Sequence, residues 1–177
     1  MRVLLVGINP GVRSAAIGHH FAGYSNRFWK LLHESLLVPE PIGTEDDHRL
    51  PEWGFGITNL VARATPGIDT LRPEEFIAGA RALRRKVRRW KPEVVAFIGV
   101  TVYRAVYPKG RGERDRRRMQ GAGRQETTPD PFSVGLQADS FEGARVFVLP
   151  NPSGRNANFT YVQMLDAYRA LAAYLSS

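Results

Sequence analysis

The sequence contains no cysteine among its 177 residues. A disulfide framework, a metal site with cysteine ligands and a thiol nucleophile are therefore excluded. Long apolar runs are also lacking, because the first one ends at Ile8, before an Asn-Pro-Gly turn. That run is too short for a signal peptide or a membrane span. We therefore expect a soluble, cytoplasmic protein with no membrane partner, associated with the nucleoid if it is bacterial.

Acidic residues are scarce relative to basic ones. The sequence has 17 Asp and Glu against 25 Lys and Arg, which gives a formal net charge of +8 at pH 7. Such an excess on a small domain attracts polyanions, chiefly nucleic acid or anionic lipid, although arginine that only keeps the protein soluble is the alternative. Basic residues gather in two places. One is a face of the helix expected from Pro73 onward, within residues 81–91, and the other is an insert loop at about residues 109–131. That insert either contacts DNA or is a solvated loop.

Apolar runs alternate with helical patterns along the chain, and a length of 177 residues fits one domain covering residues 1–177. The patterns predict strands at residues 3–8, 55–60, 94–99 and 146–149. They predict helices at residues 25–36 with Ser25 as N-cap, from Pro73 onward, at residues 102–106 and at residues 161–175. This order indicates an α/β fold, with three α/β/α layers and a central, mostly parallel sheet.

A parallel sheet places its binding site at the carboxyl ends of its strands. Here the rule selects Asn9, the turn at residues 99–101 and the loop at residues 151–158.

The first candidate site is the Gly-Ile-Asn-Pro-Gly turn at residues 7–11. It has neither the glycine spacing nor the lysine of a phosphate-binding loop, and an ordinary turn at a strand end is the alternative. The amide of Asn9 can hold a water molecule but cannot ionise to accept a proton. The reaction must then have a dissociative transition state. Cleavage of a pyrimidine N-glycosidic bond fits, because the sugar gains oxocarbenium character and the base leaves as a delocalised anion.

Two further loops carry candidate residues. In Gly-His-His-Phe-Ala-Gly at residues 18–23, Phe21 is suited to stack on a base from a flexible loop, unless it is a core residue. The adjacent histidines lack the spacing of a metal site. In the loop at residues 151–159, backbone amides suit phosphate contacts, and Arg155 suits a phosphate or the gap left by a flipped base. The alternative is a plain connection in which Asn158 or Thr160 caps the last helix.

Together these motifs resemble the mismatch-specific uracil and thymine DNA glycosylase family, a branch of the uracil-DNA glycosylase superfamily. The resemblance extends from residue 3 to about residue 171. It depends on four motifs in the family's order, at residues 7–11, 18–30, 56–67 and 150–159. It implies a three-layer α/β domain that flips uracil out of G-mismatched double-stranded DNA and hydrolyses its N-glycosidic bond. The expected product is an abasic site for base excision repair, and thymine and other modified pyrimidines are further candidate substrates.

The resemblance also implies roles for individual residues. Asn9 matches the catalytic residue that positions the hydrolytic water, and Phe21 matches the aromatic that stacks on the flipped base. The implied base pocket further includes Gly7, Ile8, His20, Asn26, Asn59 and Thr65. The implied DNA-binding loop consists of Ser153, Gly154, Arg155 and Asn156. Bacterial members carry an intercalating Leu where Arg155 stands, so an arginine wedge is closer to the thymine glycosylases.

We expect no metal and no cofactor, because no pocket motif supplies zinc ligands at suitable spacing or a Lys for β-lyase chemistry. The expected partner is double-stranded DNA with a mismatched or damaged base, and the expected state is a monomer. Two alternatives remain, a non-catalytic module that binds damaged DNA and a hydrolase of free nucleosides.

Overall fold

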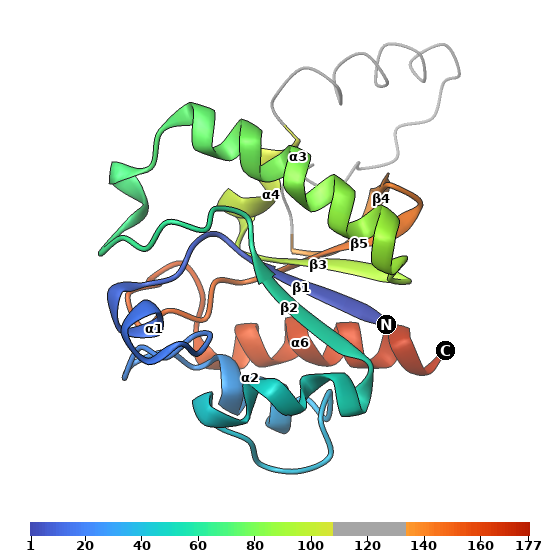
Figure 1. Cartoon of the computed structure of the whole chain (residues 1–177). Helices are drawn as coiled ribbons and strands as arrows, with labels where there is room; N and C mark the ends of the chain where they lie inside the picture. The colour runs from blue at the N-terminus through green and yellow to red at the C-terminus, as the bar shows by residue number, and fades with distance from the viewer. Residues whose placement is uncertain (108–133) are drawn as a thin grey trace.

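A central five-stranded sheet organises the molecule in the computed structural model, which describes residues 1–107 and 134–177 (Figure 1). The predicted basic insert at residues 109–131 lies outside these residues. The spatial order of the strands is β2-β1-β3-β5-β4. Their bounds are β1 Val3–Gly7, β2 Phe55–Asn59, β3 Val94–Ile98, β4 Gly135–Phe141 and β5 Ala144–Leu149. All neighbouring pairs are parallel except β4 and β5, which confirms the mostly parallel sheet.

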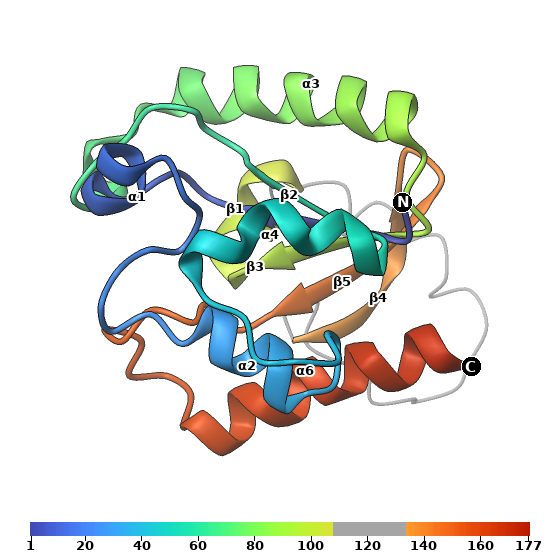
Figure 2. The same cartoon turned by 60° about the horizontal axis from the view of Figure 1, so that its bottom comes forward.

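Helices cover both faces of the sheet and complete the predicted three layers (Figure 1). One face carries α3 (Pro73–Trp90) and α4 (Val100–Val106), and the other carries α2 (Phe28–Glu34), α6 (Tyr161–Ser176) and the 3-10 segment η1 (Thr44–Trp53). The short helix α1 (Val12–Ile17) lies beside the carboxyl ends of the strands (Figure 2). In the part of the chain described, no helix is both long and apolar enough to span a membrane.

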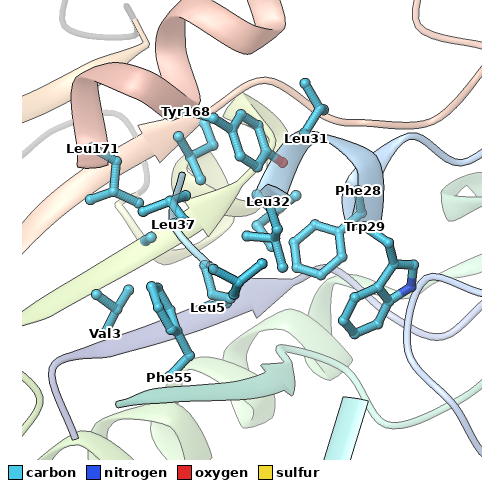
Figure 3. Close-up of a cluster of buried hydrophobic side chains, with 14 of the residues drawn as sticks. Val3, Leu5, Phe28, Trp29, Leu31, Leu32, Leu37, Phe55, Tyr168 and Leu171 are labelled. Carbon is cyan, nitrogen blue, oxygen red and sulfur yellow. The ribbon is translucent and has the colours of Figure 1, made fainter. Parts of the chain in front are cut away.

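Burial on both faces explains the continuous apolar runs. In β1, Val3 and Leu5 pack with α2 and α6, while Leu4 and Val6 pack with α3 and α4. Figure 3 shows the first of these clusters, where Leu5 lies under the side chains of α2 and Tyr168 reaches in from α6. A strand held from both sides has little freedom to move. The residues that follow β1 therefore start from a fixed position.

The structure differs from the sequence-based prediction at β4, α1 and η1, which were not predicted. In β4 only Gln137 and Phe141 are buried, so this edge strand has no apolar run to mark it. A two-residue turn, Glu142 and Gly143, joins β4 to β5 with φ angles of 51° and 90°. Positive φ at both positions is typical of a tight hairpin.

The prediction for Ser25 as a helix cap is wrong. Helix α2 begins at Phe28, and the side chain of Asn26 accepts a hydrogen bond from the backbone N–H of Phe28 at 2.9 Å. For the last helix, the Thr160 hydroxyl accepts from the Gln163 backbone N–H at 3.2 Å and caps α6.

Candidate active site

A cleft of about 500 Å³ opens where β1, β2, β3 and β5 end. Most of the residues selected from the sequence line it, namely Ile8, Asn9, His20, Phe21, Asn26, Asn59, Thr65, Ser153 and Arg155. Gly7, Gly154 and Asn156 do not. Asn156 lines an adjoining hollow of about 280 Å³, which it shares with Arg155. The topology thus brings together residues that are up to about 150 positions apart in the sequence.

Backbone pairing continues past the sheet and holds two of the cleft segments against each other. Beyond the ends of β1 and β2, the N–H groups of Leu60 and Val61 donate to the carbonyls of Gly7 and Ile8, both at 2.8 Å. The Thr65 N–H then donates to the Pro10 carbonyl at 3.2 Å. The segment that carries Asn9 therefore lies directly beside residues 60–65.

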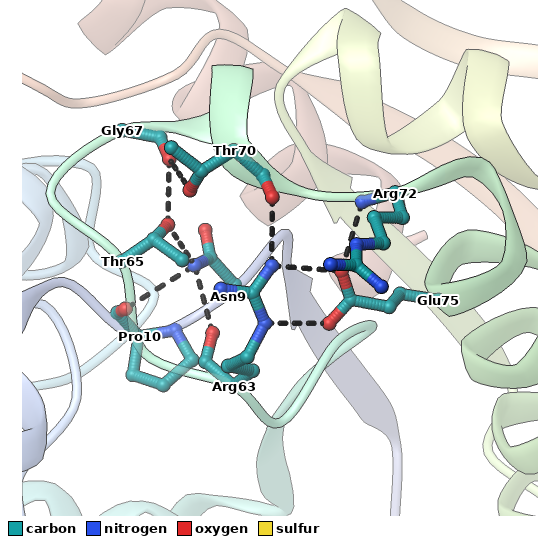
Figure 4. A network of polar contacts seen from close by, with 8 residues as sticks. All are labelled: Asn9, Pro10, Arg63, Thr65, Gly67, Thr70, Arg72 and Glu75. Atoms are coloured by element: carbon teal, nitrogen blue, oxygen red, sulfur yellow. Dashed lines mark hydrogen bonds and ion pairs between the residues drawn. The ribbon is translucent and has the colours of Figure 1, made fainter.

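This pairing places Asn9 in a network with the segment after β2 (Figure 4). The Nδ2 group of Asn9 donates to the Arg63 carbonyl at 3.0 Å and to Thr65 Oγ1 at 2.7 Å. The Thr65 hydroxyl in turn donates to the Gly67 carbonyl at 2.6 Å. A carbonyl oxygen can only accept, so the Thr65 hydroxyl donates its proton to the Gly67 carbonyl. The Thr65 hydroxyl oxygen and the Arg63 carbonyl oxygen are then both acceptors, and each requires an N–H donor from Asn9. The contacts therefore fix which end of the amide is the nitrogen.

The other end of the amide, Oδ1, has no hydrogen-bond partner among the described residues. It belongs to a residue that lines the cleft, and an amide oxygen is only an acceptor. Thr65 beneath it is 4% exposed, so the network is closed off from water on that side. Asn9 can thus offer the cleft one fixed acceptor that carries no charge.

The aromatic residue of the cleft is held more firmly than the sequence suggested. Phe21 stacks on Phe28 of α2 with the ring centroids 4.2 Å apart and the planes at 27°. Its backbone has φ of 50°, which is uncommon for a bulky side chain. Next to it, the Ala22 N–H donates to Ser14 Oγ at 3.0 Å, and Arg13 Nε donates to the Ala22 carbonyl at 2.8 Å. These contacts hold the backbone beside Phe21, and its partly buried ring packs against the core cluster that includes Phe28.

The two histidines of this loop contact one carboxylate. Asp47 of η1 lies 2.9 Å from His19 Nδ1 and 3.2 Å from His20 Nδ1, and it accepts from the His20 backbone N–H at 3.0 Å. Partial burial alone would raise the pKa of Asp47, but these hydrogen bonds outweigh it and lower the pKa below its usual range. The histidines therefore anchor the loop to η1, and among the described residues no set of three or more His, Asp or Glu is arranged to hold a metal ion.

Gly7 lies beneath the pocket rather than in its lining. A Cβ at this position would be 2.7 Å from Asn59 Oδ1 and 3.2 Å from Phe21 Cζ. The absence of a side chain therefore lets both residues settle over the end of β1. The Asn59 side chain hydrogen-bonds to no other described residue, which leaves its amide available to a ligand. In Asn26, by contrast, Oδ1 already accepts a hydrogen bond from the Phe28 backbone N–H at the start of α2.

The loop after β5 is preorganised by its own side chains. Asn151 Oδ1 accepts from the Ser153 N–H at 3.0 Å, and Asn156 Nδ2 donates to the Asn151 carbonyl at 2.8 Å. A Cβ at Gly154 would be 2.8 Å from the Ser25 carbonyl oxygen, so glycine permits the contact between these two loops. Arg155 is exposed at the rim, and no described residue pairs with its guanidinium group.

Two charged residues that connect to Asn9 through the Arg63 carbonyl were not selected from the sequence. Arg63 binds Glu75 through two hydrogen bonds, Nε to Oε1 at 2.7 Å and Nη2 to Oε2 at 2.8 Å, and Nη2 also donates to the Thr70 carbonyl at 2.7 Å. These contacts, together with the Arg72 N–H, lower the pKa of Glu75 from 4.5 to about 2. Glu75 lies in the first turn of α3, and no local sequence pattern indicates Arg63 as its partner.

The basic face of α3 lies away from the cleft. Helix α3 begins near the carboxyl ends of the strands and ends at the start of β3 (Figure 1). Two of its arginines, Arg84 and Arg88, pair with Glu142 at 2.7 and 2.6 Å. The last turn of α3, with Arg88 and Arg89, is therefore at the opposite end of the sheet from Asn9.

Comparisons with known proteins agree with this arrangement. The family model described as the Uracil DNA glycosylase superfamily matches residues 1–173. The chain is similar to the curated G/U mismatch-specific uracil DNA glycosylase of Schizosaccharomyces pombe, with 38% identity over 160 residues. That match covers 89% of this chain and 45% of the relative, so the chain spans about half the length of the curated relative.

Proposed function

Because the chain belongs to the uracil DNA glycosylase superfamily, we propose that it is a monofunctional glycosylase that removes uracil from G-mismatched double-stranded DNA. The observation that carries this proposal is the fixed, uncharged acceptor of Asn9 in a cleft that also holds the stacked ring of Phe21. An acceptor of this kind can orient water without deprotonating it. N-glycosidic cleavage suits such an acceptor, because its transition state needs little help from a base.

In the proposed reaction, Asn9 Oδ1 accepts a hydrogen bond from a water molecule and holds its oxygen toward C1′ of the flipped nucleotide. The bond from C1′ to N1 of uracil breaks, and its electron pair leaves with the base. The water oxygen then bonds to C1′, and the proton that it loses passes to solvent or to the departing base. The products are free uracil and an abasic site. The main contribution of the protein is to position the reactants.

We propose that the base is recognised between Phe21, which stacks on it, and the amide of Asn59, which hydrogen-bonds its polar edge. Their neighbours Ile8, His20 and Asn26 complete the pocket. Stacking on an aromatic side chain contributes about 1–3 kcal/mol per base. Thymine differs from uracil by one methyl group, for which a pocket discriminates by only about 1–3 kcal/mol, so thymine and other modified pyrimidines are candidate substrates.

We propose that Arg155 enters the duplex as the base leaves it. Its exposed guanidinium, which pairs with none of the described residues, stands at the rim of the cleft on a loop held by Asn151 and Asn156. Ser153 and Gly154 beside it would contact the phosphate backbone through their amides. The net charge of +8 favours binding to DNA, so affinity should fall steeply as salt is added. The proposed enzyme acts as a monomer in base excision repair.

A labelled duplex with one U:G pair tests the proposal. Incubation followed by alkali should break the labelled strand at the uracil. A non-catalytic binding module would bind the duplex and leave it alkali-resistant, whereas a nucleoside hydrolase would instead release uracil from free deoxyuridine regardless of salt. Parallel T:G, hypoxanthine and single-stranded uracil substrates define the range of bases. Arg155→Ala should slow excision more for U:G duplex than for single-stranded uracil, and an equal loss on both would contradict the wedge role.

A further inference from the structure

The orientation of Asn9 depends on residues that lie outside the cleft. One of its two strong anchors is the backbone carbonyl of Arg63. Residue 63 lies in a segment between β2 and α3 whose only regular structure is the three-residue turn η2 (Ile68–Thr70). Backbone hydrogen bonds hold Val61 and Thr65 on either side of Arg63, and the Arg63 side chain adds contacts of its own that fix the residue between them.

The Arg63 side chain connects this segment to the start of α3 (Figure 4). Its guanidinium group donates to both carboxylate oxygens of Glu75 and to the Thr70 carbonyl. Glu75 is itself fixed, because it belongs to the first turn of α3 and its Oε2 accepts from the Arg72 N–H at 2.8 Å. Helix α3 in turn contacts the same segment at Gly79, where a Cβ would lie 2.2 Å from the Leu60 carbonyl oxygen.

We propose that Arg63 and Glu75 are positioning residues for excision, since their ion pair holds the Arg63 carbonyl in the place that orients the Asn9 amide. This inference depends on the proposed role of Asn9 in excision. A path of direct contacts runs from the Glu75 carboxylate through the Arg63 guanidinium and main chain to Asn9 Nδ2. Neither residue contacts the cleft, so neither is a catalytic residue.

The Arg63–Glu75 ion pair is exposed, so we expect it to matter for positioning Arg63 more than for the stability of the fold. The side chains of Arg63 and Glu75 are 48% and 24% exposed, and exposed ion pairs contribute little to the free energy of folding. A planar guanidinium can bind a carboxylate through two hydrogen bonds and still donate to a third acceptor, which the ammonium group of lysine matches poorly. Displacing a reactant by about 1 Å can slow a reaction by about 100-fold. An ion pair that contributes little to the free energy of folding can therefore have a large effect on the excision rate.

Single-turnover excision at saturating enzyme, with a U:G duplex, tests the proposal in the full chain. Arg63→Gln and Glu75→Gln should each lower the rate by about 10-fold to 100-fold, with unchanged affinity for abasic duplex. Arg63→Lys should recover only part of the loss. Arg88→Gln is the matched control, because it also breaks an exposed ion pair between an arginine and a glutamate, here Glu142, at the far end of α3. This control should excise uracil at the wild-type rate.

The double variant Asn9→Ala/Arg63→Gln separates positioning from general damage. If Arg63 acts through Asn9, the double variant should excise uracil no more slowly than Asn9→Ala alone. A further loss in the double variant, or an Arg63→Gln rate equal to that of Arg88→Gln, would overturn the proposal. A wild-type protein inert on U:G duplex would instead count against the proposed function.

A readout without substrate keeps the two proposals apart. In the wild-type protein, the side-chain amide protons of Asn9 should exchange slowly in ¹⁵N-resolved NMR spectra, because both are hydrogen-bonded. In Arg63→Gln they should exchange markedly faster, while the backbone amides of the sheet keep their protection. Unchanged exchange of the Asn9 side chain in this variant would refute the positioning role whether or not the protein excises uracil.

Discussion

Replacing Thr65 by Val tests the Asn9 network at its most buried member. Valine keeps the volume and the branched form of threonine but removes the hydroxyl group. That hydroxyl accepts from Asn9 Nδ2 at 2.7 Å and donates to the Gly67 carbonyl at 2.6 Å, and the residue is 4% exposed. The substitution therefore removes two hydrogen bonds and leaves a donor and an acceptor without these partners.

The expected magnitude follows from these two bonds. Each hydrogen bond contributes about 0.5–1.5 kcal/mol, so the free energy of unfolding should fall by about 1–3 kcal/mol. Asn9 would keep its second anchor, the Arg63 carbonyl at 3.0 Å, and would be misoriented for only part of the time. We expect this partial misorientation to cost about 1.4–2 kcal/mol of transition-state stabilisation, which slows excision by about 10-fold to 30-fold.

Thermal unfolding and single-turnover excision of a U:G duplex measure the two effects of Thr65→Val. Thr65→Ser is the control, since it keeps the hydroxyl group and removes only a methyl. We expect Thr65→Ser to stay close to the wild-type excision rate. Wild-type excision by Thr65→Val, or equal slowing in the two variants, would refute the assigned role of the hydroxyl group.

Three other predictions address the surroundings of the site. Gly7→Ala should displace Asn59 and Phe21 together, and it should weaken binding of a uracil-containing duplex more than that of an abasic duplex; equal weakening in a binding titration would argue against a base pocket at these residues. Gly79→Ala should lower the thermal midpoint despite the roughly 1 kcal/mol higher helix propensity of alanine, because its Cβ meets the Leu60 carbonyl, and a raised midpoint would contradict the close packing. The lowered pKa of Glu75 means that its ion pair stabilises the fold fully above pH 4.5 and loses this effect as the pH falls toward about 2. Denaturation midpoints across that range should therefore decline less steeply in Glu75→Gln than in the wild type, and parallel declines would contradict the shift.

The sequence predicted the parts of the fold that burial controls. Strands β1, β3 and β5 are covered on both faces, so their apolar runs were recognisable, and the strand–helix order then gave the mostly parallel sheet. The edge strand β4 has one partner strand and a polar sequence, so it left no such pattern. Its position is decided by pairing with β5 and by the two-residue turn, neither of which a local pattern reveals.

For the site, the sequence predicted which segments meet but not how their side chains are held. Asn9 was recognisable because an amide at a strand end suits water, and the family resemblance supplied its neighbours. The position of the Phe21 ring depends on its stacking on Phe28 of α2. The direction of the Asn9 amide depends on residues 63 and 65, more than fifty positions away. The Arg63–Glu75 pair joins a loop to a helix, and such a contact follows from packing rather than from any local motif.

Excision by Asn9→Ala tests the central claim most directly. Under single-turnover conditions with a U:G duplex, the variant should lose at least about 100-fold in rate, the cost expected when a reacting group loses its positioning. Its affinity for abasic duplex should remain close to that of the wild type, because Asn9 is proposed to hold water rather than DNA. Excision by Asn9→Ala at a rate near that of the wild type would contradict the account.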